Sequence, residues 1–369
     1  MTTIAANPSA GLALPQWRPV VPATETPTVP PAAPASVHRR GELLDSHGRT
    51  IRDLRLSLTD RCNFRCTYCL EPDVRFAPPE ALLSAAELVR LAQVAASLSI
   101  RKIRLTGGEP TLRPELDSIA AAIVGQTGCE VALITNGSRG TPDRVRAWKA
   151  AGIARVTVSL DTLHEARFAA ITRSAGSVAG VVACIERCIA EGLGPVKVNA
   201  VLMRGVNDDE AVGFARLARR LGIEMRFIEW MPLDSGHSWR NDRWVPAAET
   251  RRAIEAEHPL VALEGGDPSS TARTFAFRDG SPGRVGFIAP ISTPFCGACS
   301  RLRITADGKV RPCLFSTTEW DIRPLLRGGA DDRDLARFLI DAAWSKQAGH
   351  GIESPGFTQP ERPMSAIGG

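Results

Sequence analysis

The chain has 369 residues, a formal net charge of +5, and 44% apolar against 23% charged residues. This length suits one large domain or two ordinary ones, and the composition is that of a soluble globular enzyme. The small positive charge does not indicate nucleic-acid binding, and no apolar run is long enough to span a bilayer. We therefore expect neither a nucleic-acid partner nor a membrane partner.

The first 42 residues are rich in proline and alanine, and eight of the 27 prolines lie within the first 34 positions. A segment of this composition cannot build a core, so residues 1–42 are predicted to be a disordered extension without a catalytic role. The scarcity of acids also allows a transit peptide, although basic residues are sparse before Arg39 and Arg40.

From Asp53 onward, strand-like and helix-like segments alternate. The predicted strands are Asp53–Thr59, Lys102–Thr106, Glu130–Thr135, Arg155–Leu160, Val196–Met203 and Glu224–Met231. The predicted helices are Ser84–Leu98, Glu115–Gln126, Pro142–Ala151, Ser177–Glu191 and Asp208–Leu221. Ser84 with Glu87 is a capping box, and Thr141 before Pro142 is a helix start. Six such units in a row predict an α/β fold, a partial (βα)6 TIM-like barrel with its helices outside.

The predicted strands carry polar side chains on one face and apolar side chains on the other. Arg55 and Ser57 alternate with leucines in the first strand, and similar alternation recurs at 102–106, 156–161 and 196–199. Parallel strands that are covered on both faces should be almost wholly apolar. We therefore expect an open, curved sheet with a polar, basic interior rather than a closed and packed barrel.

Three cysteines, Cys62, Cys66 and Cys69, follow the first predicted strand with C-x3-C-x2-C spacing. Three thiolates on one loop can hold a 4Fe–4S cluster and leave its fourth iron open, whereas electron-transfer ferredoxins supply four cysteines. A zinc or redox thiol site is the alternative, because C-x2-C also suits zinc. After the second strand, the glycines of Gly107–Pro110 permit close backbone approach to a ligand, and Glu109 can accept from an ammonium group.

A second triplet, Cys296, Cys299 and Cys313, again has no obvious fourth cysteine. It suits a second 4Fe–4S cluster with an open iron, and zinc completed by His350 is the alternative. The other three cysteines are interpreted as small buried side chains: Cys129, Cys184 and Cys188. Because free thiolates must stay available for iron, a reducing cytoplasm is expected.

The chain resembles the radical S-adenosylmethionine (SAM) enzymes in its Cys62 loop and Gly-Gly-Glu-Pro turn, and within them the GTP 3′,8-cyclase (MoaA) family of molybdenum-cofactor biosynthesis. The match runs from about Leu43 to the C-terminus. Its further motifs are Leu105–Pro110, Ile134–Gly137, Val158–Asp161, Val196–Val201, the Cys296 region with Arg301–Arg303, and Gly368–Gly369. The resemblance implies a radical SAM barrel over 43–235 and, over 236–369, a region with the second cluster, a GTP site and a Gly-Gly tail.

The resemblance also implies a role for each matching residue. Clusters would be held by Cys62, Cys66 and Cys69, whose open iron binds SAM, and by Cys296, Cys299 and Cys313, whose open iron meets the substrate. SAM contacts would be Tyr68, Gly108, Ser159 and Met231. GTP contacts would be Arg55, Arg104, Thr135, Lys197, Arg301, Leu302 and Arg303, with Lys102 and Arg226 as further triphosphate contacts. Catalytic roles would fall to Arg301, Arg303, Gly368 and Gly369.

The implied reaction is radical SAM cyclisation of GTP to (8S)-3′,8-cyclo-7,8-dihydroguanosine 5′-triphosphate, the first step of molybdenum-cofactor biosynthesis. The implied partners are a low-potential electron donor, a downstream cyclic pyranopterin monophosphate synthase and a second copy of the chain in a homodimer. Two rival interpretations stay open. One is a radical SAM peptide maturase, for which no leader-peptide-binding module is visible. The other is a non-catalytic zinc or iron scaffold.

Overall fold

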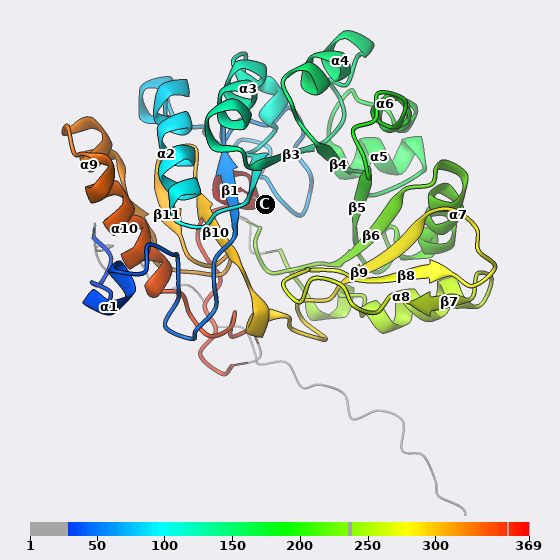
Figure 1. The fold of residues 1–369 in the computed structure, drawn as a ribbon. Coiled ribbons are helices and arrows are strands. Elements are labelled where there is room, and N and C mark those ends of the chain that lie inside the picture. Colours follow the sequence, from blue (N-terminus) through cyan, green and yellow to red (C-terminus); the bar gives the residue numbers. More distant parts are fainter. Residues whose placement is uncertain (1–28, 235–237, 353, 369) are drawn as a thin grey trace, which may run out of the picture.

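The computed structural model describes residues 29–234, 238–352 and 354–368 (Figure 1). Its strands are β1 Asp53–Ser57, β2 Lys102–Thr106, β3 Glu130–Thr135, β4 Arg155–Ser159, β5 Lys197–Leu202, β6 Glu224–Glu229, β7 Leu260–Ala262, β8 Arg273–Phe277, β9 Arg284–Ile288, β10 Arg301–Ile304, β11 Lys309–Arg311 and β12 Trp320–Asp321. Its α-helices are α1 Ala35–His38, α2 Ala85–Ser97, α3 Leu116–Thr127, α4 Pro142–Ala150, α5 Glu165–Thr172, α6 Val178–Ala190, α7 Ala211–Leu221, α8 Ala247–Glu255, α9 Arg323–Arg327, α10 Asp332–Trp344 and α11 Met364–Ile367.

Within the described residues, one open sheet of twelve strands has the order β12-β11-β10-β1-β2-β3-β4-β5-β6-β9-β8-β7. Strands β10, β1 to β6 and β9 run parallel, and an antiparallel pair follows at each side. Figure 1 shows the sheet curving, with α2, α3, α4, α6 and α7 on its outer face. The predicted partial barrel of six βα units is confirmed as β1 to β6, and the flanking strands were not predicted.

The predicted elements agree with the observed ones to within three residues at each end, because local signals set their boundaries. Ser84 Oγ accepts from the Glu87 amide at 3.2 Å, and the Glu87 carboxylate accepts from the Ser84 amide at 2.7 Å, which confirms the capping box of α2. Thr141 caps α4 ahead of Pro142 as predicted. The helix predicted from Asp208 starts instead with a 3-10 turn, and α7 begins at Ala211.

The two faces of the strands differ as the alternating pattern predicts. Leu54 and Leu56 of β1 are fully buried toward the helices, whereas Arg55 between them is only half-buried and lines the concave face. Strand β2 repeats the pattern, with Arg104 half-buried between buried Ile103 and Leu105. The sheet is therefore packed on its convex side and polar on its concave side.

The C-terminal region extends the sheet of the partial barrel on both sides. Strand β9 pairs with β6, and β10 pairs with β1, so the sheet runs across the boundary expected at 235/236. Helix α10 packs against α2 and α1 at the β10 side. None of the helices in the described parts of the chain is both long and apolar enough to cross a lipid bilayer.

The predicted disordered extension is only partly described, since residues 1–28 lie outside the described residues. Its remainder is ordered, which corrects the prediction for 29–42. Val37 of α1 is buried, and the Ala33 amide donates to Asp341 Oδ1 of α10 at 2.7 Å. These contacts offset the entropy cost of ordering the segment. The composition of the segment does not reveal them, because they are made with a distant helix.

Replacing Phe214 by alanine tests the packing of the helical layer. Phe214 on α7 is fully buried, and its ring meets that of Phe227 on β6 edge-to-face at 6.1 Å. We expect Phe214→Ala to lower the free energy of unfolding by about 3–5 kcal/mol, measured by urea denaturation. The control Ile189→Ala, at a side chain 39% exposed on α6, should change it by only about 0.5 kcal/mol. Equal losses in the two variants would contradict this packing.

Candidate active site

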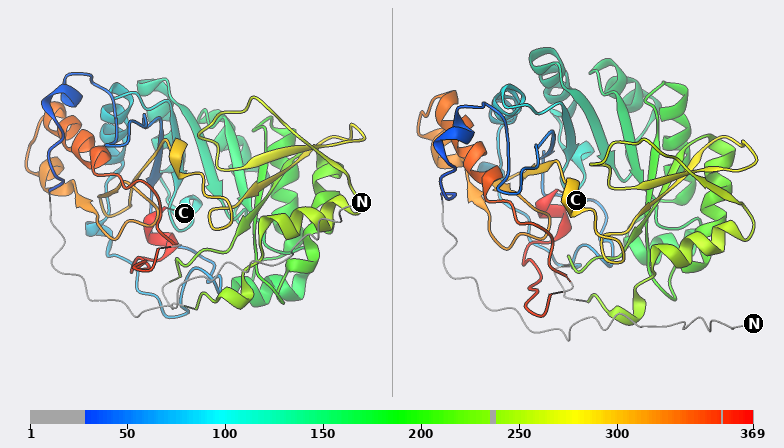
Figure 2. Two further views of the ribbon diagram at one scale, coloured as in Figure 1. Left: turned by 90° about the horizontal axis from the view of Figure 1, so that it is seen from below. Right: turned by 60° about the horizontal axis from the view of Figure 1, so that its bottom comes forward.

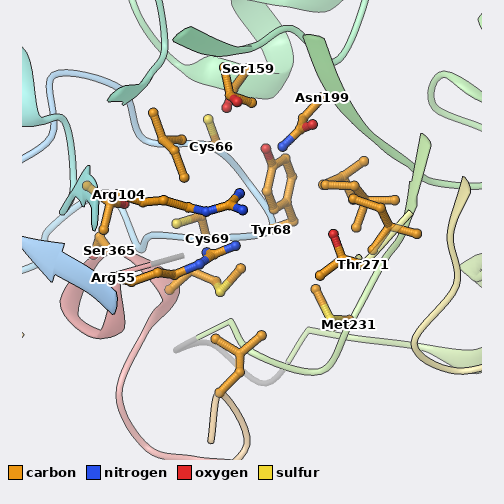
Figure 3. Close-up of a pocket in the computed structure, with 18 of the residues that line it drawn as sticks. Arg55, Cys66, Tyr68, Cys69, Arg104, Ser159, Asn199, Met231, Thr271 and Ser365 are labelled. Carbon is orange, nitrogen blue, oxygen red and sulfur yellow. The ribbon is translucent and has the colours of Figure 1, made fainter. Parts of the chain in front are cut away.

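One cavity on the concave face brings the two cysteine triplets together. Its lining includes the six predicted cluster ligands Cys62, Cys66, Cys69, Cys296, Cys299 and Cys313. It also includes the predicted SAM contacts Tyr68, Gly108, Ser159 and Met231, and the predicted GTP contacts Arg55, Arg104, Thr135, Arg226, Arg301 and Arg303. Figure 3 shows Arg55 and Arg104 extending into this cavity beside Cys69 and Tyr68. Residues predicted from widely separated motifs thus meet in one place.

Three predicted GTP residues do not line this cavity. Leu302 is fully buried in the hydrophobic core on the opposite face of β10, so its side chain offers the cavity nothing. Lys102 and Lys197 are the first residues of β2 and β5. Each pairs with a carboxylate: Lys102 Nζ lies 3.8 Å from Glu130, and Lys197 Nζ lies 3.2 Å from Glu224.

The glycines of the Gly-Gly-Glu-Pro turn are required by the cysteine loop. A Cβ on Gly107 would lie 2.2 Å from the Thr59 carbonyl oxygen, and one on Gly108 would lie 2.4 Å from that of Arg61. The Gly108 amide donates to Thr59 at 2.9 Å. The absence of side chains therefore lets the turn pack on the backbone that leads into Cys62. Both glycines also line the cavity, and their approach to a ligand stays a prediction.

Glu109 is buried and engaged with the protein. Its Oε1 accepts from the Thr111 amide and hydroxyl and from the Thr135 hydroxyl at 2.7 Å, and its Oε2 accepts from the Asn136 amide at 2.7 Å. Burial raises the pKa of this carboxyl in spite of these bonds. Glu109 thus ties the end of β2 to the end of β3, and the hydroxyl hydrogen of Thr135 is already used. The expectation that Glu109 binds an ammonium group stays a prediction.

The first triplet consists of half-buried thiols whose surroundings oppose ionisation. Burial is the largest cause that raises the pKa of Cys62 to about 11 and that of Cys69 to about 12, and the thiols' mutual repulsion adds to the shift of Cys69. The pKa of Cys66 is raised in the same way. Three thiolates side by side need positive charge between them, and a 4Fe–4S cluster supplies it. The donor set therefore fits such a cluster.

The second triplet has cationic surroundings. Arg301 Nη2 donates to Cys299 Sγ at 3.1 Å. Burial opposes ionisation of Cys299, but the charges of Arg301 and Lys346 outweigh it and lower the pKa to about 6. Burial raises the pKa of Cys296, whose sulfur receives the backbone N–H of His350. These three thiols also fit a cluster, which would carry negative charge into a positive environment.

His350 does not suit the zinc alternative. Its Nε2 lies 2.6 Å from the Pro290 carbonyl oxygen and must donate to it, and its Nδ1 accepts from the Ile352 amide at 3.1 Å. Both ring nitrogens are therefore used by the backbone, and a zinc ligand needs a free nitrogen lone pair.

A group of arginines gives the cavity a strong positive charge. Burial, and then repulsion from Arg303, Arg104 and Arg301, lowers the pKa of Arg55. Burial and Arg301 lower the pKa of Arg303 to about 10. Within the described residues, Arg55 Nε, Arg301 Nη1 and Arg303 Nε are buried without a hydrogen-bond partner. Buried cations that repel one another and keep unused donors fit a polyanionic ligand.

The C-terminal segment enters the same cavity. Helix α11 lies inside the curve of the sheet in both views of Figure 2, and Met364 and Ser365 line the cavity. Arg55 Nη1 donates to the Gly368 carbonyl at 3.3 Å. Gly368 has a φ of +73°, and a Cβ there would lie 2.6 Å from Ser57 Oγ, so only glycine suits this position. Gly369 lies outside the described residues.

Sequence reasoning missed contacts that hold the site in place. The Tyr68 hydroxyl donates to Asp161 Oδ2 at 2.7 Å, and Asp161 Oδ1 accepts from the Val201 amide at 2.8 Å. Burial raises the pKa of Asp161 to about 6. Ser365 donates its backbone N–H to Cys69 sulfur, and Lys346 lines the cavity. Asp161 lay in a recognised motif, but no local pattern marked Lys346 or Ser365.

Comparison with known proteins places the chain in a class that the fold and the first triplet already define. The model of the radical SAM superfamily matches residues 56–218, and that of Molybdenum Cofactor Synthesis C matches 223–352. Among solved structures, Streptococcus suis SuiB bound to its precursor peptide SuiA is similar with a TM-score of 0.59 at 14% identity, over 87% of this chain and 69% of that one. At that identity the likeness shows the fold alone. The chain is a radical SAM enzyme, and this class uses a 4Fe–4S cluster and SAM.

Curated relatives narrow the class to a family. A GTP 3′,8-cyclase of Mycobacterium sp. (strain KMS) is 46% identical over 342 residues, which cover 91% of this chain and 96% of the relative. GTP 3′,8-cyclase 2 of Mycobacterium tuberculosis (strain ATCC 25618 / H37Rv) is 45% identical over 95% of this chain and 98% of the relative. The Streptomyces coelicolor GTP 3′,8-cyclase is 46% identical over 89% and 96%. The chain belongs to the GTP 3′,8-cyclase family.

Replacing Gly107 by alanine tests the packing of the turn on the cysteine loop. We expect Gly107→Ala to push the Thr59 backbone away, to lower the free energy of unfolding by about 1–3 kcal/mol, and to reduce the iron bound after reconstitution. The control Gly125→Ala adds a Cβ in α3 with no heavy atom within 4 Å, so its iron content should be unchanged. Urea denaturation and iron analysis measure both. A Gly107→Ala protein with normal stability and iron would show that the contact is unimportant.

Proposed function

We propose that this chain cyclises GTP to 3′,8-cyclo-7,8-dihydro-GTP as the first step of molybdenum-cofactor biosynthesis. The observation that carries the proposal is that both cysteine triplets and the repelling arginines line one cavity. The family of the chain supports the same reaction. The proposed function includes a division of the chain into two parts. Residues 43–235 act on SAM, and residues 236–369 add the second cluster and the GTP site.

Cys62, Cys66 and Cys69 would hold the first cluster, with SAM as its cofactor. Together they would supply the hydrogen-abstracting chemistry needed at C3′ of GTP before a bond forms to C8 of guanine. Gly108 and Ser159 line the cavity and position SAM, together with Tyr68 and Met231. Asp161 fixes the Tyr68 ring by accepting from its hydroxyl. The reactive group formed from SAM must meet GTP before it meets water. The main task of these residues is therefore to position SAM and GTP.

Cys296, Cys299 and Cys313 would hold a second 4Fe–4S cluster on the side of the cavity that takes the guanine base. The unused donors of Arg55, Arg301 and Arg303 bind the nucleotide. Arg104 and Arg226, which pair with Asp53 and Glu224, contribute further guanidinium donors to the same cavity. Charge-assisted bonds from several guanidinium groups are strong enough to hold a tetra-anion. Lys102 and Lys197 now pair with Glu130 and Glu224, and they leave these carboxylates to bind the triphosphate when GTP is present. Thr135 and the backbone of Leu302 are the remaining GTP contacts.

Arg301 and Arg303 stabilise charge on the base during cyclisation, and the Gly-Gly tail of Gly368 and Gly369 reaches the reacting centre. The bond from Arg55 to the Gly368 carbonyl supports this placement of the tail, because Arg55 also belongs to the arginine group. The enzyme further requires a low-potential electron donor and passes its product to a cyclic pyranopterin monophosphate synthase. It acts as a homodimer in the cytoplasm, where thiols stay reduced.

The proposed reaction is tested by incubating the reconstituted protein anaerobically with reductant, SAM and GTP. We expect GTP to be consumed and 5′-deoxyadenosine to form in equal amounts, as measured by liquid chromatography with mass spectrometry. The control with Cys296, Cys299 and Cys313 replaced by alanine should leave GTP intact. If the intact protein forms 5′-deoxyadenosine but GTP stays unchanged, the substrate assignment is wrong.

GTP affinity should depend on pH through Lys197. Burial and Arg226 lower the pKa of Lys197 to about 8, so its positive charge is present at pH 7 and is lost as the pH rises to 9. We expect GTP binding to weaken about tenfold over this range, measured by calorimetry without SAM. Lys197→Arg, which stays charged, should show a much smaller decrease. The same GTP affinity at pH 7 and 9 in the unmodified protein would show that Lys197 does not bind GTP.

Removal of Gly368 and Gly369 should abolish cyclisation while SAM and GTP still bind. The physical reason is that the cluster cysteines and arginines stay in place, and only the tail that Arg55 holds is lost. Product formation and the binding of each ligand are measured on the same preparation. Full turnover by the truncated protein would retire the role of the tail.

A further inference from the structure

Arg49 is a buried arginine that holds the backbone around Cys296. Its Nη1 donates to the carbonyl oxygen of Cys296 at 2.7 Å and to that of Ala348 at 2.8 Å, and its Nη2 donates to that of Gln347 at 2.6 Å. Its Nε pairs with Asp45, which is fully buried. All three guanidinium nitrogens are therefore used, and three of the four acceptors are main-chain carbonyls near the second triplet.

Lys346 is a buried lysine that holds the backbone around Cys299 and Cys313. It is only 2% exposed, and its Nζ donates to the Arg301 carbonyl at 2.8 Å and to the Pro312 carbonyl. Arg301 lies two residues after Cys299, and Pro312 immediately precedes Cys313. Burial lowers the pKa of Lys346, and the thiolates of Cys299 and Cys313 act against this shift and favour its charge.

Both cations fix one short segment, residues 346–350: Arg49 binds its backbone, and Lys346 is its first residue. Arg49 fixes the carbonyls of 347 and 348, Lys346 reaches from this segment to β10 and Pro312, and His350 donates its N–H to Cys296 sulfur. Each cysteine of the second triplet is thus held, directly or through a neighbouring residue, by this segment. Outer contacts of this kind orient the ligands of a metal centre and tune its properties.

We propose that Arg49 and Lys346 are positioning residues of the second cluster, that Arg49 fixes the Cys296 ligand, and that the charge of Lys346 raises the reduction potential of the cluster. The inference rests on the proposed second cluster. Three thiolates give that centre a net negative charge, which increases on reduction, so a buried ammonium group nearby favours the reduced form. Neither residue contacts the nucleotide in this account, and both act through the cysteine segments.

The role of Lys346 is tested in a protein whose Cys62, Cys66 and Cys69 are replaced by alanine, so that only the second cluster remains. Lys346→Gln and Lys346→Arg are compared by iron analysis and by redox titration followed by electron paramagnetic resonance. We expect Lys346→Gln to shift the midpoint potential downward and Lys346→Arg, which keeps the charge, to keep it near that of the parent. Equal potentials in all three proteins at full iron content would overturn this role of Lys346.

The role of Arg49 is tested by Arg49→Lys in the same parent protein. Lysine keeps the ion pair with Asp45 but cannot donate to four acceptors at once, so we expect a loss of at least half of the bound iron. The matched control is Arg187→Lys, since Arg187 donates to the Gly140 carbonyl at 2.8 Å on the outer side, away from the cavity lining. Circular dichroism checks that each variant is folded.

These outcomes separate the inference from the proposed function. If the parent protein with only the second triplet binds about four irons and Arg49→Lys binds as many, the positioning role of Arg49 is wrong. If the parent protein itself binds no iron, the second triplet does not hold a cluster. That result contradicts the proposed function, and the inference that rests on it is then wrong as well. A larger loss of iron in Arg49→Lys than in Arg187→Lys supports the inference.

Discussion

The parallel pairing of β10 with β1 is the constraint on which the whole site depends. Its register sets Arg301 beside Asp53 and Arg303 beside Arg55, although about 250 residues separate these strands in the chain. This pairing brings the second triplet to the same cavity as the first and adds two arginines to those of β1 and β2. Without it, the chain would hold two unrelated cysteine loops.

The thiols of the two triplets differ in their electrostatic surroundings within that cavity. Burial is the main cause that raises the pKa of Cys62 and Cys69 in the first triplet. In the second triplet burial also raises the pKa of Cys296, but Arg301 and Lys346 lower that of Cys299. A site that must split a cationic cofactor and hold a polyanionic substrate benefits from such a division. Its cost is the mutual repulsion of buried arginines, which the packed convex face of the sheet must offset.

Much of the fold could be predicted from the sequence because local rules determine it. Alternating faces, capping residues and the spacing of the cysteines depend on neighbours within a few positions, and β1 to β6 were found in this way. The strands at 284–288 and 301–304 were missed because they gain their stability by pairing with strands far away in the chain, β6 and β1. The same reason hid Lys346 and the packing of Gly107 on Thr59, since both contacts join segments far apart in the chain. The order of 29–42 also depends on a distant helix, α10.

The central claim is that each triplet leaves one iron open, one for SAM and the other for the nucleotide. Electron paramagnetic resonance of the anaerobically reduced protein tests it most directly, with SAM and GTP added separately. The account predicts that SAM alters the signal of one cluster and GTP that of the other. Two signals that respond to neither compound, or a single signal that responds to both, would contradict it.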